Sequence, residues 1–336
     1  MRNIHRFHLQ KYSKGNKGTC PNCHRPNCFV RYVDEEGLIK FTSDIGRCDH
    51  ENSCGYHKSP REYFRENQHL YSQFKNNGYI KSTKLIKTES TSYINDDIVK
   101  ATLGHYSINP LFQYFCRIFG HEASLKLFKL YRIGTSSIWN GSTIFWQTDL
   151  NGKVRAGKIM DYNPINGRRI KVPINRINWA HSILKMSDFH LKQCFFGEHL
   201  LKGSARSVAI VESEKTALVA AHYMPDYIWL ATGGKHGCFN SEAIKVLSGR
   251  RVLLVPDLNA FKDWKEKESM FQNIGCEVNT FKFLEDNANQ EQIYSGLDIG
   301  DFLLKEKTPH QILFELIDKN PLLKKLITDL NLTICD

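Results

Sequence analysis

The 336-residue sequence lacks a hydrophobic run long enough to cross a membrane, and its N-terminus, MRNIHRFHLQ, lacks the apolar segment of a secretory signal. It also contains no G-x-x-x-x-G-K-[ST] loop, which excludes a helicase activity of the P-loop type within this sequence. We therefore expect a cytoplasmic protein that has no membrane partner.

Most of the ten cysteines lack the spacing of metal ligands. Disulfides are not expected in the cytosol, so these residues are interpreted as small packing residues. They are Cys28, Cys116, Cys194, Cys238, Cys276 and Cys335.

Positive charge is abundant but unevenly distributed. The formal net charge is +11, made up of +7 over residues 1–90, +9 over 91–206 and −5 over 207–336. Basic side chains neutralise nucleic-acid phosphates, whereas acidic side chains can hold metal ions. This asymmetry favours a nucleic-acid enzyme, and the alternative is a basic protein with no such role.

Four N-terminal cysteines have ligand spacing. Cys20 and Cys23 form a C-x-x-C pair, and Cys48 and Cys54 form a wider pair after a 24-residue interval. That interval predicts a hairpin, in which FVRYV and LIKFT flank the turn DEEG. Two cysteine pairs around a hairpin are typical of a zinc ribbon with a structural Zn²⁺ ion. His57 is the first alternative ligand, His50 lies close in sequence, and four unrelated thiols are the other interpretation.

The predicted hairpin also carries rings and cations of the kind that bind single strands. These residues are Phe29, Arg31, Tyr32, Lys40 and Phe41. Arg31 is therefore a candidate DNA-binding residue, and the alternative is that the rings form the core of the ribbon.

Two acidic residues follow short apolar runs in the last third of the chain. Glu212 follows SVAIV and Asp257 follows RVLLVP, and both runs are typical of buried parallel strands. Ligands bind at the carboxyl ends of such strands, and carboxylate oxygens suit Mg²⁺ or Mn²⁺. We therefore predict a metal site at Glu212 and Asp257.

A third acidic cluster, Asp298 and Asp301, completes an E…D…D-x-x-D order that resembles the Toprim domain of bacterial-type DNA primases, topoisomerases and nucleases. The resemblance covers residues 205–305 and implies that these four acids are catalytic. The family usually has D-x-D after the second strand, whereas this chain has Asp257-Leu258-Asn259. Asn259 can ligate Mg²⁺ through its amide oxygen but adds no charge, and Asp263 could compensate.

Residues 142–173 alternate in polarity around two Asn-Gly turns, at 151–152 and 166–167, which predicts a β-meander. Several basic residues alternate along one face, which predicts a DNA-binding strip or, alternatively, a solvated face. They are Lys153, Arg155, Lys158, Arg168, Arg169 and Lys171.

Phosphate-binding candidates lie in the Toprim-like part. The segment TGGK could cradle a phosphate through backbone N–H groups, or it could be only a tight turn. The candidate residues are Lys215, Gly233, Gly234 and Lys235.

The predicted order is a zinc ribbon (1–65), a linker (66–95), a basic α+β module (96–204), an α/β Toprim domain with a parallel sheet flanked by helices (205–305), and C-terminal helices (306–336). A zinc ribbon ahead of a Toprim-like domain resembles the arrangement of bacterial-type primases, in which the finger helps to read the template. The segments CPNC, CGYH, GKIMDYN, FGEHLL, VESEKT, ATGGK and PDLNA resemble zinc-finger–Toprim proteins of bacterial mobile elements.

These likenesses imply a primase-like nucleotidyltransferase that acts on single-stranded DNA and NTPs. Its expected partner is a separate helicase or replication initiator. Two alternatives stay open, a Toprim nuclease and a non-catalytic DNA-binding factor with a degenerate site. Asn259 favours the non-catalytic factor.

Overall fold

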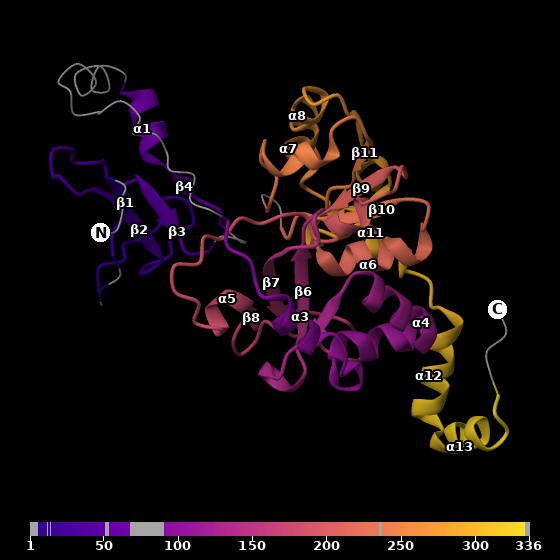
Figure 1. The fold of residues 1–336 in the computed structure, drawn as a ribbon. Helices are drawn as coiled ribbons and strands as arrows, with labels where there is room; N and C mark the ends of the chain where they lie inside the picture. The colour runs from indigo at the N-terminus through magenta and orange to yellow at the C-terminus, as the bar shows by residue number, and fades with distance from the viewer. Residues whose placement is uncertain are drawn as a thin grey trace. The chain divides into compact units, whose positions relative to one another are not determined.

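The computed structural model describes residues 6–11, 13, 15–50, 54–67, 91–234 and 237–332. The chain divides into two compact units, Met1–Thr88 and Glu89–Asp336, which are considered separately below (Figure 1). Most of the predicted linker, residues 68–90, lies outside the described residues. Its final part does not: Ile94 is buried and forms a β-bridge with Val154.

The first unit contains a small antiparallel sheet in the order β1-β2-β3-β4. Its elements are β1 (Phe7–Leu9), β2 (Phe29–Asp34), β3 (Gly46–Cys48), β4 (His57–Lys58) and helix α1 (Pro60–Glu66). The predicted partner strand LIKFT does not form, and β2 pairs instead with β1 and β3. The reason is local, because the Asp34 carboxylate accepts the backbone N–H groups of Leu38 and Ile39 and so holds a loop after β2.

Most of the rings that the sequence offered for stacking are core residues of this unit. Phe29 is 1% exposed and packs among the cysteines, while Phe41 makes edge contacts with Phe7 and Tyr63. Tyr32 stacks on His57. Among the candidates on β2, Arg31 is exposed.

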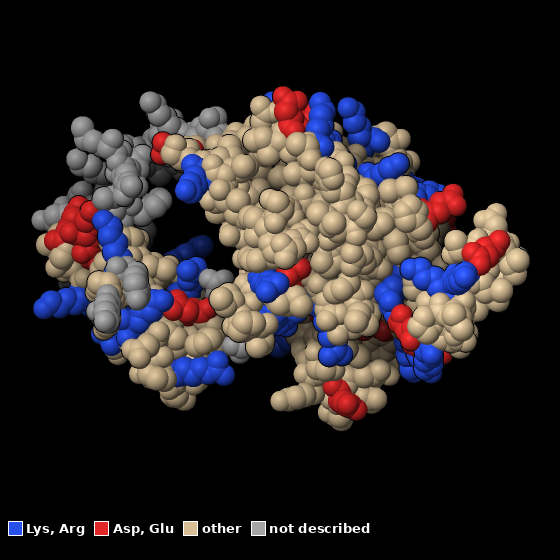
Figure 2. Space-filling model, turned by 90° about the horizontal axis from the view of Figure 1, so that it is seen from below, with Lys and Arg blue, Asp and Glu red and all other residues tan. Residues whose placement is uncertain are grey.

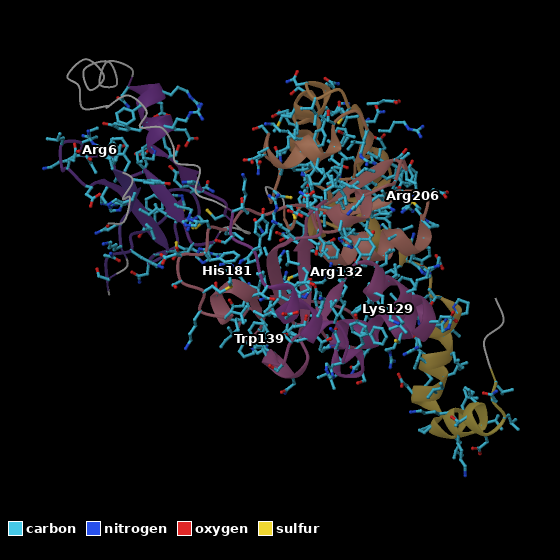
Figure 3. All side chains as sticks on the ribbon, viewed as in Figure 1. Arg6, Lys129, Arg132, Trp139, His181 and Arg206 are labelled. Carbon is cyan, nitrogen blue, oxygen red and sulfur yellow. The ribbon has the colours of Figure 1, made fainter. Side chains whose placement is uncertain are left out.

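The second unit begins with an antiparallel sheet in the order β5-β6-β7-β8. Its strands are β5 (Ile133–Thr135), β6 (Thr143–Thr148), β7 (Val154–Met160) and β8 (Ile177–Trp179). The helices around it are α3 (Asp96–Thr102), η1 (Tyr106–Ile108), α4 (Pro110–Leu130), η2 (Ile138–Asn140) and α5 (Ala180–Ile183). Arg132, labelled in Figure 3, pairs with Asp96 at 3.1 Å and connects the end of α4 to α3.

The predicted meander is confirmed in its first hairpin. β6 and β7 pair around Asn151-Gly152, where Gly152 has φ 81°. The third strand was expected at 168–174, but that segment makes only the isolated bridge Tyr162–Arg169, and β8 pairs with β7 instead. Pro173 lacks the N–H that a strand would donate, and the neighbouring apolar side chains Val172 and Ile174 are exposed rather than packed.

A four-stranded parallel sheet follows, in the order β10-β9-β11-β12. Its strands are β9 (Val208–Val211), β10 (Ile228–Ala231), β11 (Arg251–Leu254) and β12 (Glu277–Thr280). η3 (Glu198–Leu201) precedes β9, and the elements between the strands are α6 (Glu214–Tyr223), η4 (Ala243–Leu247), α7 (Phe261–Glu266) and α8 (Glu268–Gln272). The predicted apolar runs before Glu212 and Asp257 are confirmed as β9 and β11, and their residues Val208, Ile210, Val252 and Leu254 are buried.

The two sheets of this unit share one hydrophobic core. α4 supplies Phe115 and Phe128, β6 supplies Phe145, and the parallel sheet supplies Val211 and Trp229. The Tyr131 hydroxyl donates to the Trp229 carbonyl at 3.0 Å. The segments predicted as separate modules are therefore packed together.

The chain ends in α9 (Phe283–Asn287), α10 (Gln290–Ser295), α11 (Ile299–Leu303), α12 (Pro309–Lys319) and α13 (Pro321–Asp329). The two predicted C-terminal amphipathic helices are α12 and α13. α12 packs against α4 rather than covering the parallel sheet, and the Thr308 hydroxyl donates to the Ile118 carbonyl (Figure 1). Within the described ranges, no helix combines the length and apolarity of a membrane span.

Candidate functional site

Two of the predicted acids lie at the carboxyl edge of the parallel sheet. Glu212 follows β9 and Asp257 follows β11, and these two strands are neighbours. The chain moves from β9 outward to β10 on one side, then to β11 and β12 on the other, so the strand order reverses between β9 and β11. Open α/β sheets bind ligands at such a reversal, outside the carboxyl ends of the strands.

The other two acids begin helix α11. The Asp298 carboxylate accepts the Asp301 N–H at 2.9 Å, and the Asp301 carboxylate accepts the Asp298 N–H at 3.2 Å. The Thr216 hydroxyl donates to Asp298, which connects α11 to α6 just beyond Glu212. This reciprocal cap fixes both acids beside the carboxyl edge of the sheet.

The four carboxylates influence one another electrostatically. Burial raises the pKa of Asp257 to about 9, with further increases from the charges of Glu212, Asp298 and Asp301. Burial and Asp298 likewise raise the pKa of Asp301, and the positive charges of Lys215 and Arg168 oppose that rise. The predicted acids therefore lie close enough to act on one another electrostatically, and Lys215 and Arg168 act on Asp301, although no three of the acids place ligand oxygens within 4.8 Å of one another in the described structure.

This arrangement fits a hard divalent cation. Oδ1 of Asp257 is buried and has no hydrogen-bond partner among the described residues. A buried carboxylate oxygen without a donor is costly, and a cation would remove that cost and favour the ionised form. Carboxylates from Glu212, Asp257, Asp298 and Asp301 could supply oxygen ligands.

Asn259 has a structural task in the turn after β11. Its φ is 72°, a left-handed value that asparagine tolerates, and its amide nitrogen donates to the Ile293 carbonyl of α10. Only the amide oxygen is left for a metal, so the Mg²⁺ role of Asn259 stays a prediction. Asp263 lies in α7 (Phe261–Glu266).

The predicted turn at Gly233 and Gly234 is present, but one backbone N–H group that was expected to bind phosphate already donates a hydrogen bond within the protein. Gly233 and Gly234 have φ values of 82° and 146°. The Gly233 N–H donates to the Glu212 carbonyl at 3.0 Å, so it is not free to bind a phosphate in this structure. Lys235 lies outside the described residues. Lys215 donates to the Gly167 carbonyl at 3.4 Å.

Lys158 is not on an exposed DNA-binding strip. Its side chain is 9% exposed, and its Nζ donates to both Glu214 oxygens, at 3.1 and 3.2 Å, and to the Gly233 carbonyl at 2.9 Å. The alternation of β7 suggested an outward side chain, but α6 and the glycine turn cover this position. Gln147 lies nearby, with both amide atoms buried and without partners in the described part of the chain. The alternation of polar and apolar residues in the sequence does not predict that Glu214 and Gln147 lie beside Lys158.

The other basic candidates lie in three different surroundings. Arg155 pairs with buried Asp149 at 2.9 Å and lines a cavity of about 570 Å³, so it does not extend a surface strip. Lys153 is exposed, and its Nζ lies 4.8 Å from the centre of the Tyr93 ring. The remaining three, Arg168, Arg169 and Lys171, lie in the loop after β7.

That loop is the best-placed part of the predicted strip. Arg168 and Lys171 are exposed, whereas Arg169 is partly buried and approaches the Met160 sulfur at 3.9 Å. On the face seen in Figure 2, lysine and arginine side chains of the larger unit lie toward the margins, and the centre is largely uncharged. Of the basic candidates, Arg168 and Lys215 carry charges that act on Asp301.

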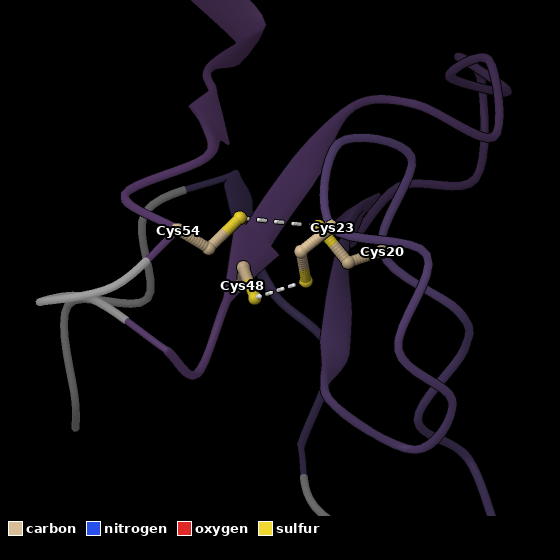
Figure 4. Close-up of side chains that lie close together, drawn as sticks. All are labelled: Cys20, Cys23, Cys48 and Cys54. Carbon is tan, nitrogen blue, oxygen red and sulfur yellow. Dashed lines mark hydrogen bonds between the residues drawn. The ribbon is translucent and has the colours of Figure 1, made fainter.

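The four predicted zinc ligands converge in the first unit (Figure 4). The sulfur atoms of Cys20 and Cys54 lie 3.6 Å apart, those of Cys23 and Cys48 lie 3.9 Å apart, and all four fall within 4.8 Å of one another. β2 and β3 and their flanking turns hold them. His57 instead contacts the Tyr32 hydroxyl through Nε2 at 2.9 Å, which favours four thiolates over a histidine substitute.

Neighbouring donors contact two of these sulfurs. The Asn22 amide donates to the Cys54 sulfur at 3.4 Å and, with the Tyr56 backbone N–H, lowers the pKa of Cys54 to about 6. The His50 N–H lies 3.5 Å from the Cys48 sulfur, although burial raises the pKa of that thiol. Such outer donors are typical of structural zinc sites, and the residues present fit Zn²⁺.

Comparisons with known proteins give two family matches. Residues 5–69 match a family described as a zinc beta-ribbon finger, and residues 109–258 match the family named Domain of unknown function (DUF6371). No curated protein sequence matches the chain. The N-terminal unit is thus a zinc-binding region, and it precedes an α/β core with a parallel sheet.

Solved primase structures show a distant likeness. The primase fragment of the bacteriophage T7 primase-helicase protein is 12% identical, with 84% of this chain and 98% of that chain covered and a TM-score of 0.33. The zinc-binding and RNA polymerase domains of the Aquifex aeolicus primase are 14% identical, with 93% and 84% covered and a TM-score of 0.34. These superpositions are too loose to decide the activity.

Proposed function

We propose that the chain is a primase-like, metal-dependent nucleotidyltransferase that acts on single-stranded DNA. The observation that carries this proposal is the position of Glu212 and Asp257 at the carboxyl ends of neighbouring strands, where the charges of Asp298 and Asp301 also act on Asp257. Such a Toprim-like arrangement, with Asp257 buried and its pKa raised, suits a divalent cation and phosphate chemistry.

Each group has a role in the proposed reaction. Glu212 and Asp257 hold Mg²⁺ or Mn²⁺, and Asp298 or Asp301 completes the oxygen ligands. A divalent ion held by these acids would supply positive charge for the NTP phosphates while a 3′-hydroxyl attacks the α-phosphate in line and pyrophosphate leaves. Lys215 and Arg168, whose charges act on Asp301, contact phosphate oxygens.

The zinc-binding region contributes template binding in this proposal, with exposed Arg31 as its candidate contact. Arg168 and Lys171 supply further cations for the strand. Replication or mobilisation of a mobile element is the setting that the motif resemblance implies. A helicase or replication initiator would then be a separate protein.

A non-catalytic DNA-binding factor is the second candidate, and Asn259 favours it. The residue after Asp257-Leu258 brings no charge, and its amide serves the turn through Ile293. A site with one fewer carboxylate binds cations less strongly, so the fold could persist after turnover is lost.

The test is to incubate the full chain with single-stranded DNA, labelled NTPs and Mg²⁺ or Mn²⁺. New labelled oligonucleotides that disappear in Glu212→Gln support the proposal. Shortening of the input DNA indicates a nuclease instead. DNA binding without either product, in both metals, indicates the non-catalytic factor. Asp226→Asn, an exposed acid outside the cluster, is the matched control.

A further inference from the structure

The zinc-binding region holds a second set of four potential ligands that overlaps the first. Sγ of Cys23, Cys28 and Cys48 and a ring nitrogen of His50 all lie within 4.8 Å of one another. Cys23 and Cys48 belong to both sets, so the two sets together contain five thiols and one imidazole.

Four contacts within the two sets, at 3.5 to 3.9 Å, have the length of the edges of a zinc tetrahedron. With Zn–S bonds of about 2.3 Å and Zn–N bonds of about 2.0 Å, an S···S edge is about 3.8 Å and an S···N edge about 3.5 Å. Cys28 and Cys48 lie 3.8 Å apart, and Nδ1 of His50 lies 3.5 Å from the Cys48 sulfur. The Cys23–Cys48 distance of 3.9 Å, common to both sets, has the length of a shared edge.

We propose that this region binds two zinc ions that share the Cys23 and Cys48 thiolates. Cys20 and Cys54 complete the first tetrahedron, and Cys28 and His50 complete the second. Each bridging sulfur uses two lone pairs, one for each ion. Six protein ligands then give both ions four-coordinate, closed sites, as structural zinc prefers.

Charge favours the second ion. One Zn²⁺ with four thiolates leaves two negative charges in a cluster where Cys20, Cys28 and Cys48 are at most 4% exposed. Two Zn²⁺ ions with five thiolates and a neutral histidine leave one. Because buried charge is costly, the binuclear state reduces the cost.

Of the three thiols in the second set, only Cys28 would lose a hydrogen bond to a group outside the two sets when zinc binds. Cys28 donates its S–H to the Arg25 carbonyl at 3.1 Å, and ionisation would replace that neutral hydrogen bond with a zinc bond. Nδ1 of His50 is already directed at the Cys48 sulfur. The second ion therefore requires only small side-chain movements.

The experiment is non-denaturing mass spectrometry of the full chain. The protein is purified without chelator and transferred to zinc-free buffer, so that only tightly bound zinc remains. We expect two zinc ions per chain for the wild type and one for Cys28→Ser and for His50→Ala. Cys116→Ser, which changes a cysteine in the second unit, should keep two. Reconstitution with ¹¹³Cd²⁺ should give two NMR resonances in the wild type and one in Cys28→Ser.

Three outcomes contradict the proposal. If the wild type saturates at one zinc ion, Cys28 and His50 are not zinc ligands. Two ions that persist in both variants place the second ion elsewhere. No zinc at all would overturn the zinc assignment of the whole region, without bearing on the acidic site of the second unit.

Discussion

At the scale of single residues, Asp257 decides how the acidic site behaves. Its carboxyl is buried beside three other acids, and one of its oxygens has no hydrogen-bond partner within the described ranges. Such a group either keeps a proton or binds a cation. Its environment therefore couples metal binding to protonation.

We predict that Glu212→Gln and Asp257→Asn each weaken Mg²⁺ binding at least tenfold, because each removes a charged oxygen ligand from the cluster. Isothermal titration of Mg²⁺ into the full chain measures this change, and Mn²⁺ gives a second reading. Asp226→Asn should bind like the wild type. Equal affinities for all four proteins would mean that these acids do not form a metal site.

The raised pKa of Asp257 also predicts a pH dependence of stability in magnesium-free buffer. The folded state holds this proton up to about pH 9, whereas an unfolded aspartate loses it near pH 4. Stability from this group is complete below the unfolded pKa and is lost as pH rises toward 9.

The measurement is denaturant unfolding from pH 5 to pH 9. The free energy of unfolding should fall more steeply with pH in the wild type than in Asp257→Asn, whose amide does not titrate. Parallel pH profiles for the two proteins would contradict the raised pKa.

At the scale of elements, the buried ion pair between Lys158 on β7 and Glu214 on α6 connects the two sheets. Removal of one partner from such a pair leaves an uncompensated charge, which typically costs about 3–5 kcal/mol. We predict that Lys158→Met destabilises the second unit by about this amount. Lys158→Met combined with Glu214→Leu should recover much of the loss.

Lys100→Met is the matched control, because Lys100 pairs with Asp96 on the surface of α3. Exposed pairs contribute about 0–1 kcal/mol, so that variant should unfold near the wild-type midpoint. Chemical denaturation of each variant provides the comparison. A Lys158→Met protein as stable as Lys100→Met would show that the pair contributes little.

Elements with strong local signals were predictable from the sequence. The apolar runs of β9, β10 and β11, the Asn151-Gly152 hairpin and the amphipathic α12 and α13 all appear where the pattern placed them. In each of these cases the residues of the element itself determine its structure.

What the sequence did not predict depends on distant segments. The burial of Lys158 requires α6 to lie over β7, and β2 pairs with β1 because Asp34 holds the loop at Leu38. Strand order likewise cannot be derived from periodicity. The positions of Glu212 and Asp257 at strand ends were predictable from the apolar runs before them, whereas Gln147 and Glu214 lacked such signals. The metal-binding role of the four acids stays a prediction.

At the scale of the whole molecule, the two units should respond independently to zinc removal. Structural zinc contributes folding free energy directly, and the described part of the first unit has two small apolar clusters, one of them around the cysteines. A strong chelator should therefore remove hydrogen-exchange protection from residues 15–67 while residues 91–332 keep theirs. Protection that persists in the first unit after zinc loss would contradict this prediction.

The salt dependence of DNA-binding affinity should show which basic residues contact DNA. Each phosphate contact to a single strand contributes about 0.7 to the slope of log K against log salt. Arg168→Ala with Lys171→Ala should therefore flatten the slope by about 1.4. Lys324→Ala with Lys325→Ala on α13 removes the same charge and should leave the slope unchanged. Fluorescence anisotropy with labelled single-stranded DNA measures both.

The shared core of the second unit has a consequence for inheritance. Tyr131 reaches Trp229, Phe196 bridges to Ala231, and Lys158 pairs with Glu214, so all three contacts cross the predicted boundary at 204–205. The single family match over residues 109–258 crosses it too. A recombination crossover at that boundary would separate every one of these partners. Relatives should therefore exchange zinc-binding regions freely but inherit the two sheets together, and chimeras joined near residue 90 should fold where chimeras joined at 205 do not.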